Sequence, residues 1–127
     1  MTTPRSTATW FPRALGVATA AYSVAIIARP DLFTGPTKLT GRGETPSTGT
    51  AIGVRALGGR DLASGLAMAL APAGAPLRTA VGVRVGSDVV DLLLLGVSLP
   101  DAGARKKAVA VATLWGGLCA LSLRFAG

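Results

Sequence analysis

Histidine is absent from this sequence of 127 residues, and cysteine occurs once, at position 119. Intrachain disulfides, zinc sites built from cysteine and histidine, and histidine-ligated haem are therefore excluded. Without histidine, the side chains that can transfer protons are carboxylates, Tyr22 and lysines. We expect no metal and no cofactor. We expect Cys119 to be a small buried packing residue, because free cysteine is commonly buried and inert.

Charged and aromatic residues are also scarce, at 15% and 5% of the chain. An ordinary soluble domain is about 25% charged. Half of the residues are hydrophobic and the mean hydropathy is +0.51. The 17 glycines suit helices that pack closely in a bilayer, where small residues let backbones approach. The composition predicts an integral membrane protein of the cell membrane, and the length predicts a single domain over residues 1–127.

Acidic residues number 6 against 13 basic ones, which gives a net charge of +7 and a pI near 11.2. Such a balance is also found in nucleic-acid-binding proteins, but here no basic stripe is interleaved with aromatic residues. The basic residues flank apolar stretches instead, as membrane topology and anionic headgroups require. We therefore expect membrane lipids as partners and no nucleic acid.

Four apolar ranges each approach the ~20 residues that span a bilayer. They cover residues 10–28, 51–71, 79–99 and 108–126, and prolines follow the first three. Short connections predict antiparallel neighbours, so the expected fold is an all-α bundle of four transmembrane helices. A secretory signal peptide is the alternative for the first range, and the other three ranges would remain membrane helices in either case.

The long connection, residues 30–50, is rich in glycine, threonine, proline and serine. It is either a disordered linker or a lid over one end of the bundle, and we favour a partly ordered loop with Leu32 and Phe33 dipping into the interface. Its side of the membrane carries six basic residues against four on the other, so the positive-inside rule favours a cytoplasmic loop. The two sets are Arg29, Lys38, Arg42, Arg105, Lys106 and Lys107 against Arg5, Arg13, Arg78 and Arg124.

Charged residues lie near the middle of the second and third ranges. Arg60 and Asp61 lie at the centre of the second. Arg84, Asp88 and Asp91 project from one face of the third, because a helix has 3.6 residues per turn. Each Arg or Asp at the bilayer centre costs about 2.5–3.5 kcal/mol, whereas a Leu or Val gains about 0.3–0.6 kcal/mol. These helices must therefore supply each other with partners.

The expected ion pairs join the two helices. Arg60 can pair with Asp88 or Asp91, and Arg84 can pair with Asp61. Two arginines against three aspartates leave one carboxylate over. That carboxylate either takes a further partner from the second helix, Arg55, or holds its proton at neutral pH.

A candidate site follows from these positions. We expect catalytic roles for Asp61, Asp88 and Asp91, and substrate-binding roles for Arg60, Arg84, Ser64, Ser87 and Tyr22. Ionisable residues inside a membrane are costly and usually functional. The alternative is a salt-bridge network that only fixes the register of two helices.

Two segments carry a resemblance to a known family. Arg29-Pro30-Asp31-Leu32-Phe33 is followed by Arg55-Ala56-Leu57-Gly58-Gly59-Arg60-Asp61-Leu62-Ala63-Ser64-Gly65-Leu66. This pattern resembles the DoxX-like group of small bacterial four-helix membrane proteins of unassigned function. The resemblance implies the four-helix fold over most of the chain and no particular activity. Arginine outnumbers lysine ten to three, which suggests a bacterium of high GC content.

Three functions fit these features. The first is a membrane-embedded acid–base enzyme, a hydrolase, isomerase or cyclase, acting on a lipophilic substrate. The second is a proton-coupled carrier or a binding protein for an amphiphilic small molecule, in which four short helices would require a homo-oligomer. The third is an accessory or scaffold protein whose charge network is structural.

Overall fold

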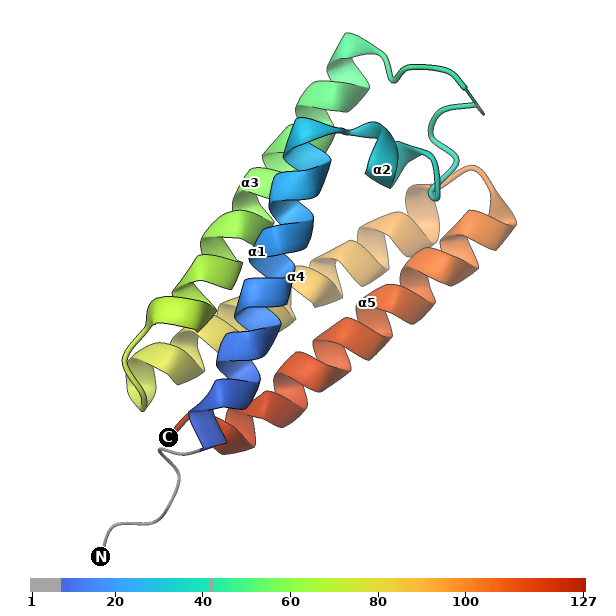
Figure 1. Cartoon of the computed structure of the whole chain (residues 1–127). Coiled ribbons are helices and arrows are strands. Elements are labelled where there is room, and N and C mark those ends of the chain that lie inside the picture. The colour runs from blue at the N-terminus through green and yellow to red at the C-terminus, as the bar shows by residue number, and fades with distance from the viewer. Residues whose placement is uncertain (1–7, 42) are drawn as a thin grey trace, which may run out of the picture.

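The computed structural model describes residues 8–41 and 43–127, so Arg5 and Arg42 of the orientation prediction lie outside the described part. This part contains five α-helices and no strands, which confirms the predicted all-α class. The long helices are α1 (Trp10–Ala28), α3 (Thr48–Leu70), α4 (Ala75–Ser98) and α5 (Ala102–Ser122), with a short α2 (Asp31–Thr34) and the 3-10 helix η2 (Leu123–Phe125). Successive long helices run in opposite directions, as predicted (Figure 1).

The first helix has the predicted bounds, but the other three long helices begin earlier than predicted. Side-chain caps start α3 and α5, whereas α4 starts with a proline in its first turn. The Thr50 N–H donates to Ser47 Oγ at 3.2 Å, and α3 therefore begins at residue 48 instead of 51. Helix α4 begins at residue 75 instead of 79. Pro76 stands in its first turn, where the missing proline N–H costs nothing.

The largest correction concerns α5, which begins at residue 102 instead of 108. The Ala104 N–H donates to Asp101 Oδ2 at 2.8 Å, so Asp101 is the N-cap. Arg105, Lys106 and Lys107 therefore belong to the helix and not to the connection before it.

The predicted loop 30–50 also contains structure. Helix α2 occupies residues 31–34, and the Thr40 hydroxyl donates to Thr34 Oγ1 at 3.0 Å. Thr34 is buried, whereas Leu32 is exposed. The segment around α2 lies at the end of the bundle where α1 ends and α5 begins (Figure 1), and Phe33, Pro36 and Thr37 of this segment line the cavity described below.

The long helices pack as two close pairs, α1 with α3 and α4 with α5. The α1–α3 crossing is at two glycines: a Cβ built on Gly65 would lie 2.7 Å from the Gly16 carbonyl oxygen. Contact between α1 and α5 is sparse, and near the middle of α1 Trp115 Nε1 donates to Thr19 Oγ1 at 3.0 Å. From there α1 and α5 diverge towards α2 (Figure 1).

The exterior of the bundle is apolar. Helix α1 and the stretch Ala102–Phe125 are long and apolar enough to cross a membrane, whereas α3 and α4 carry too many charges to meet the same criterion. Large aliphatic side chains are nevertheless exposed on all four long helices. They include Val17 and Val24 on α1, Ile52, Leu66 and Leu70 on α3, Val83, Leu93, Leu94 and Val97 on α4, and Val111 and Leu114 on α5.

Candidate functional site

Charged side chains of α3 and α4 meet inside the bundle, as their helical phase predicts. Arg84 is at the centre and its side chain is 2% exposed. Its Nη1 donates to Asp61 Oδ1 at 2.8 Å and to Ser64 Oγ at 3.0 Å, and its Nη2 donates to Asp88 Oδ1 at 2.7 Å. One guanidinium therefore joins two helices and two carboxylates.

Arg60 forms the outer part of the same network and is 37% exposed. Its Nη2 donates to both carboxylate oxygens of Asp91, at 2.9 and 2.8 Å. Its Nε and Nη2 also donate to Asp61 Oδ1, at 3.1 and 2.9 Å. Asp61 Oδ1 thus accepts from both arginines. The predicted pairs Arg60–Asp91 and Arg84–Asp61 are present, whereas Asp88 pairs with Arg84 of its own helix and not with Arg60.

The expected surplus of one carboxylate takes a form that charge counting did not predict. Arg55 does not join the network, because its Nε donates to the Ile27 carbonyl oxygen at 3.0 Å at the exposed end of α3. Each aspartate has an arginine partner. Among the described residues, however, none donates a hydrogen bond to Asp88 Oδ2, which is buried. The surplus is therefore one buried carboxylate oxygen.

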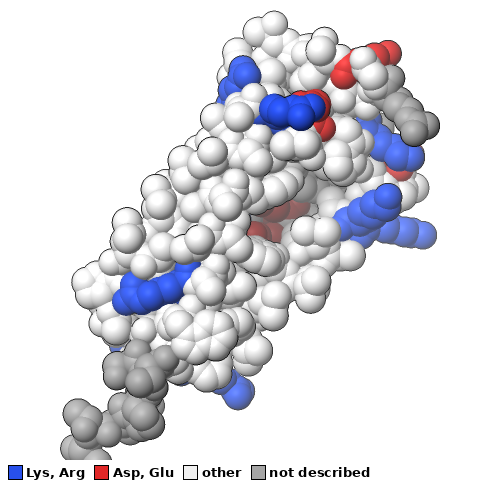
Figure 2. Space-filling view, viewed as in Figure 1, with Lys and Arg blue, Asp and Glu red and all other residues white. Residues whose placement is uncertain are grey.

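A cavity of about 530 Å³ borders this network. Asp61, Arg84, Asp88 and Asp91 form its polar wall, and the other lining residues come from α1, α5 and the segment around α2. Figure 2 shows the cavity as a hollow on one face of the molecule with acidic side chains at its floor. The apolar part of the wall includes Ile26, Phe33, Leu57, Leu95, Val111 and Trp115.

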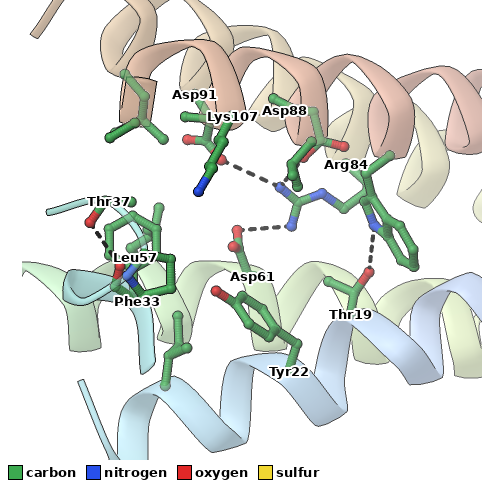
Figure 3. Close-up of a pocket in the computed structure, with 18 of the residues that line it drawn as sticks. Thr19, Tyr22, Phe33, Thr37, Leu57, Asp61, Arg84, Asp88, Asp91 and Lys107 are labelled. Carbon is green, nitrogen blue, oxygen red and sulfur yellow. Dashed lines mark hydrogen bonds and ion pairs between the residues drawn. The ribbon is translucent and has the colours of Figure 1, made fainter. Parts of the chain in front are cut away.

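Of the other predicted substrate-binding residues, Tyr22 lines the cavity, whereas Ser64 and Ser87 do not. Tyr22 lines the cavity across from Asp61 (Figure 3). Ser64 lies behind the polar wall, where it accepts from Arg84 and donates to the Asp61 carbonyl oxygen at 3.0 Å. Ser87 is half-buried and does not line the cavity, because it lies roughly 60° around α4 from Arg84.

Lys107 is the charged lining residue that the sequence prediction missed. Its side chain points into the cavity from α5 (Figure 3), and within the described part of the chain its ammonium group has no carboxylate within ion-pair distance. Lys107, Val111 and Trp115 are spaced four residues apart, which places them on one helix face. That spacing predicts a shared face once Asp101 is recognised as the N-cap, because the helix then includes Lys107.

The network has the parts for moving protons beside an apolar ligand: a buried unpaired carboxylate oxygen, two further carboxylates, and two guanidinium groups that balance charge. In the ranges 8–41 and 43–127, no group of three or more acidic or cysteine side chains is arranged to hold a metal ion. Comparisons of this chain with protein-family models, with curated proteins and with solved structures find no match.

Proposed function

We propose that this protein is a multi-pass membrane protein that performs acid–base catalysis on a lipophilic small molecule. The observation that carries the proposal is the apolar cavity of about 530 Å³ whose polar wall includes Asp88, a residue with one buried carboxylate oxygen that has no hydrogen-bond donor among the described residues. Ligand cavities of about 300–1,000 Å³ hold one small molecule and combine apolar walls with a few convergent polar groups.

The membrane part of the proposal rests on how polarity is distributed. Large aliphatic side chains cover the outside of all four long helices, while five charged side chains of α3 and α4 pair with each other inside. A soluble protein rarely exposes so continuous an apolar surface. Intramembrane charges, in contrast, characteristically face the bundle interior and pair with one another. All four long helices would then cross the bilayer.

Asp88 is the proposed acid. A buried ionised oxygen without a hydrogen-bond donor is costly, and a protonated carboxyl at the same place costs much less. With the proton on Oδ2, the hydrogen bond from Arg84 to Oδ1 is kept. Asp88 would donate this proton to a carbonyl or epoxide oxygen or to an alkene carbon of the substrate.

Asp61 is the proposed base. Its Oδ1 is occupied by Arg60 and Arg84, while no described residue donates to its Oδ2 and Asp61 lines the cavity. Asp61 would accept a proton from a substrate C–H group in isomerisation or cyclisation, or from the attacking water in hydrolysis. One proton enters the substrate and one leaves, and transfer from Asp61 to Asp88 restores the starting state. No redox partner is required.

Binding without reaction is the second candidate, because the same cavity supports it. A proton-coupled carrier belongs to this class and would require a homo-oligomer. A purely structural network is less well supported, since such a network would not require a cavity beside it or a buried oxygen left without a donor.

An isotope experiment tests the proposal without a known substrate. Protein in nanodiscs is incubated with the total lipid extract of the cells that make it, in heavy water or in water enriched in oxygen-18. Mass spectrometry then finds compounds that gain deuterium, which reports isomerisation or cyclisation, or oxygen-18, which reports hydrolysis. We expect labelled product with the wild type and none with Asp88→Asn.

The control variant is Asp31→Asn, which changes an exposed aspartate paired with Arg29 outside the cavity. It should label as the wild type does. The proposal is wrong if no compound is labelled above the Asp88→Asn background, or if single Asn variants at Asp61, Asp88 and Asp91 all keep full activity.

A further inference from the structure

The three consecutive basic residues at the start of α5 have three different environments. The Arg105 guanidinium donates to the Leu99 carbonyl oxygen at 2.7 Å and to that of Pro100 at 3.2 Å, so it closes the turn between α4 and α5. Lys106 and Lys107 are both exposed, but Lys106 does not line the cavity. Lys107 lines the cavity (Figure 3). One of the three is therefore placed to contact a ligand.

The charges around the cavity favour binding of an anion. Asp61 and Asp91 balance Arg60 and Arg84, to which they are bonded. If Asp88 holds its proton, as the proposed function requires, the four paired charges cancel, and Lys107 gives the network and the lining together a net charge of +1. Arg60 belongs to that network but does not line the cavity. Within the described residues no carboxylate lies within ion-pair distance of Lys107.

The anion site and the proposed acid lie at different depths. A Cβ on Gly116 would lie 3.1 Å from Asp88 Cβ, so Asp88 is level with Gly116 of α5. Lys107 precedes Gly116 by nine residues, or roughly 13 Å along the helix. Between them the α5 wall is apolar, with Ala108, Val111 and Trp115. Lys107 therefore lies near the end of the bundle covered by α2, and Asp88 lies near its middle.

We infer that the ligand of this cavity is a single-chain amphiphile with an anionic head, such as a long-chain carboxylate, whose head is bound by Lys107 and whose apolar chain extends towards Asp88. This inference rests on the proposed function and adds the substrate class to it. The reactive group of the substrate is then separated from the head by an apolar spacer. A cavity of about 530 Å³ suits one small molecule better than a two-chain phospholipid.

Lys107 is in this scheme a specificity-determining residue and takes no part in proton transfer. A lysine at the end of a membrane helix can keep its charged head near the interface while its stem lies along apolar surface. An amphiphile could enter through the hollow on one face of the molecule that Figure 2 shows.

The test uses tryptophan fluorescence, because Trp115 lines the cavity and Trp10 is exposed near the opposite end of α1. Trp10→Phe leaves Trp115 as the sole tryptophan of the chain. A brominated long-chain fatty acid is titrated into this variant in zwitterionic nanodiscs, and quenching of Trp115 gives the dissociation constant. The brominated alcohol of the same chain length is the neutral probe, and unlabelled anionic phospholipid is added as a competitor.

We expect the acid to bind more tightly than the alcohol. Lys107→Ala should weaken acid binding about tenfold, the factor that corresponds to about 1.4 kcal/mol. It should leave alcohol binding unchanged. Lys107→Arg should keep most of the affinity, and Lys106→Ala, the adjacent matched control, should behave as the parent does.

Three results would each overturn the inference: equal affinity of the parent for acid and alcohol, unchanged acid affinity in Lys107→Ala, or displacement of the acid by anionic phospholipid. None of these results affects isotope labelling by the wild type. If the acid binds through Lys107 but no compound is ever labelled, the head-group assignment holds and the enzymatic proposal fails. Absence of quenching by both probes contradicts the assigned ligand class.

Discussion

Arg84 is a buried cation held by three acceptors on two helices. Its guanidinium bonds to Asp61, Ser64 and Asp88, and the surrounding side chains exclude solvent. Removing one partner of a buried ion pair leaves uncompensated charge, which destabilises proteins by about 3–5 kcal/mol. We predict a loss of this size in the free energy of unfolding of Arg84→Met, measured by detergent titration of the purified protein.

The control for Arg84 is a pair of the same chemistry at the surface. Arg29 and Asp31 are 3.0 Å apart, with side chains 69% and 42% exposed. Exposed pairs contribute about 0–1 kcal/mol, so Arg29→Met should change the unfolding free energy by less than about 1 kcal/mol. Similar effects of the two substitutions would show that the interior network contributes no more than a surface pair.

Helical phase predicts the members of the network but not its connections. Asp61 is predicted to meet Arg84 because both lie near mid-helix on facing sides, and the structure contains this pair. The pairing of Asp88 with Arg84 of its own helix depends on how far α3 and α4 are separated at that level. Phase alone does not give that separation, so the sequence leaves Arg60 with a choice between Asp88 and Asp91 and does not predict the pair of Asp88 with Arg84.

At the scale of secondary-structure elements, the crossing of α1 and α3 depends on two glycines, Gly16 and Gly65. A side chain at Gly65 would meet the Gly16 carbonyl oxygen at 2.7 Å and the Ala20 nitrogen at 2.8 Å, both backbone atoms that cannot rotate away. We predict that Gly65→Ala lowers the unfolding free energy by about 1–3 kcal/mol, as overpacking does. Thermal unfolding in detergent would measure it.

Gly59 of the same helix is the matched control for Gly65. A Cβ at Gly59 has open space around it, and alanine is a better helix former than glycine by about 1 kcal/mol. Gly59→Ala should therefore be neutral or stabilising. A stabilising effect of Gly65→Ala would mean that α1 and α3 do not approach as closely as the structure describes.

The N-cap of α5 gives a pH dependence that can be measured. The Ala104 N–H bonded to the Asp101 carboxylate lowers the pKa of Asp101 below its usual 3.8, and Lys38 and Arg105 act in the same direction. A lowered folded-state pKa means that the carboxylate contributes stability above pH 3.8. That stability is lost as the pH falls through the folded pKa.

We therefore predict that Asp101→Ala lowers the melting temperature at pH 7 and that the difference from the wild type shrinks below pH 3.8. Melting curves in detergent at a series of pH values would show it. Asp101→Asn should lose less at pH 7, because asparagine is also a good N-cap. A pH-independent difference would contradict the capping role of the charge.

The same cap explains why the sequence prediction misplaced α5. The hydropathy pattern predicts a connection at Arg105, Lys106 and Lys107 because they interrupt an apolar run, yet the cap at Asp101 starts the helix before them. Hydropathy locates apolar stretches, whereas side-chain caps determine where helices begin. The candidate site consequently lacks Lys107, although this residue lines the cavity.

At the scale of the whole molecule, polarity is arranged opposite to that of a soluble protein. Charged side chains of α3 and α4 are gathered inside, and exposed aliphatic side chains cover the outside. Helices α1 and α5 are apolar enough to span a membrane by themselves. Helices α3 and α4 do not meet the same criterion. If they cross the bilayer, as we propose, their mutual pairing reduces the insertion cost of their charges, and their crossing depends on assembly with each other.

Two membrane topologies are therefore to be distinguished, one in which all four long helices cross the bilayer and one in which only α1 and α5 cross. If all four long helices cross the bilayer, the connection after α2 and the turn between α3 and α4 lie on opposite sides. If only α1 and α5 cross, both segments lie on the same side. Thr45 and Ala73 are exposed residues in these two segments, and the native Cys119 is fully buried, so single cysteines at the two positions can be labelled against a low background.

We predict that a membrane-impermeant maleimide added to sealed, right-side-out vesicles labels Ala73→Cys at once and labels Thr45→Cys only after the vesicles are opened. The direction follows from the positive-inside rule, which places the basic connection in the cytoplasm. The reverse pattern would keep four crossings and invert the orientation. Equal labelling of both variants before opening, or of neither, would leave α3 and α4 outside the bilayer, and the unpartnered Asp88 oxygen would then no longer lie in a membrane interior.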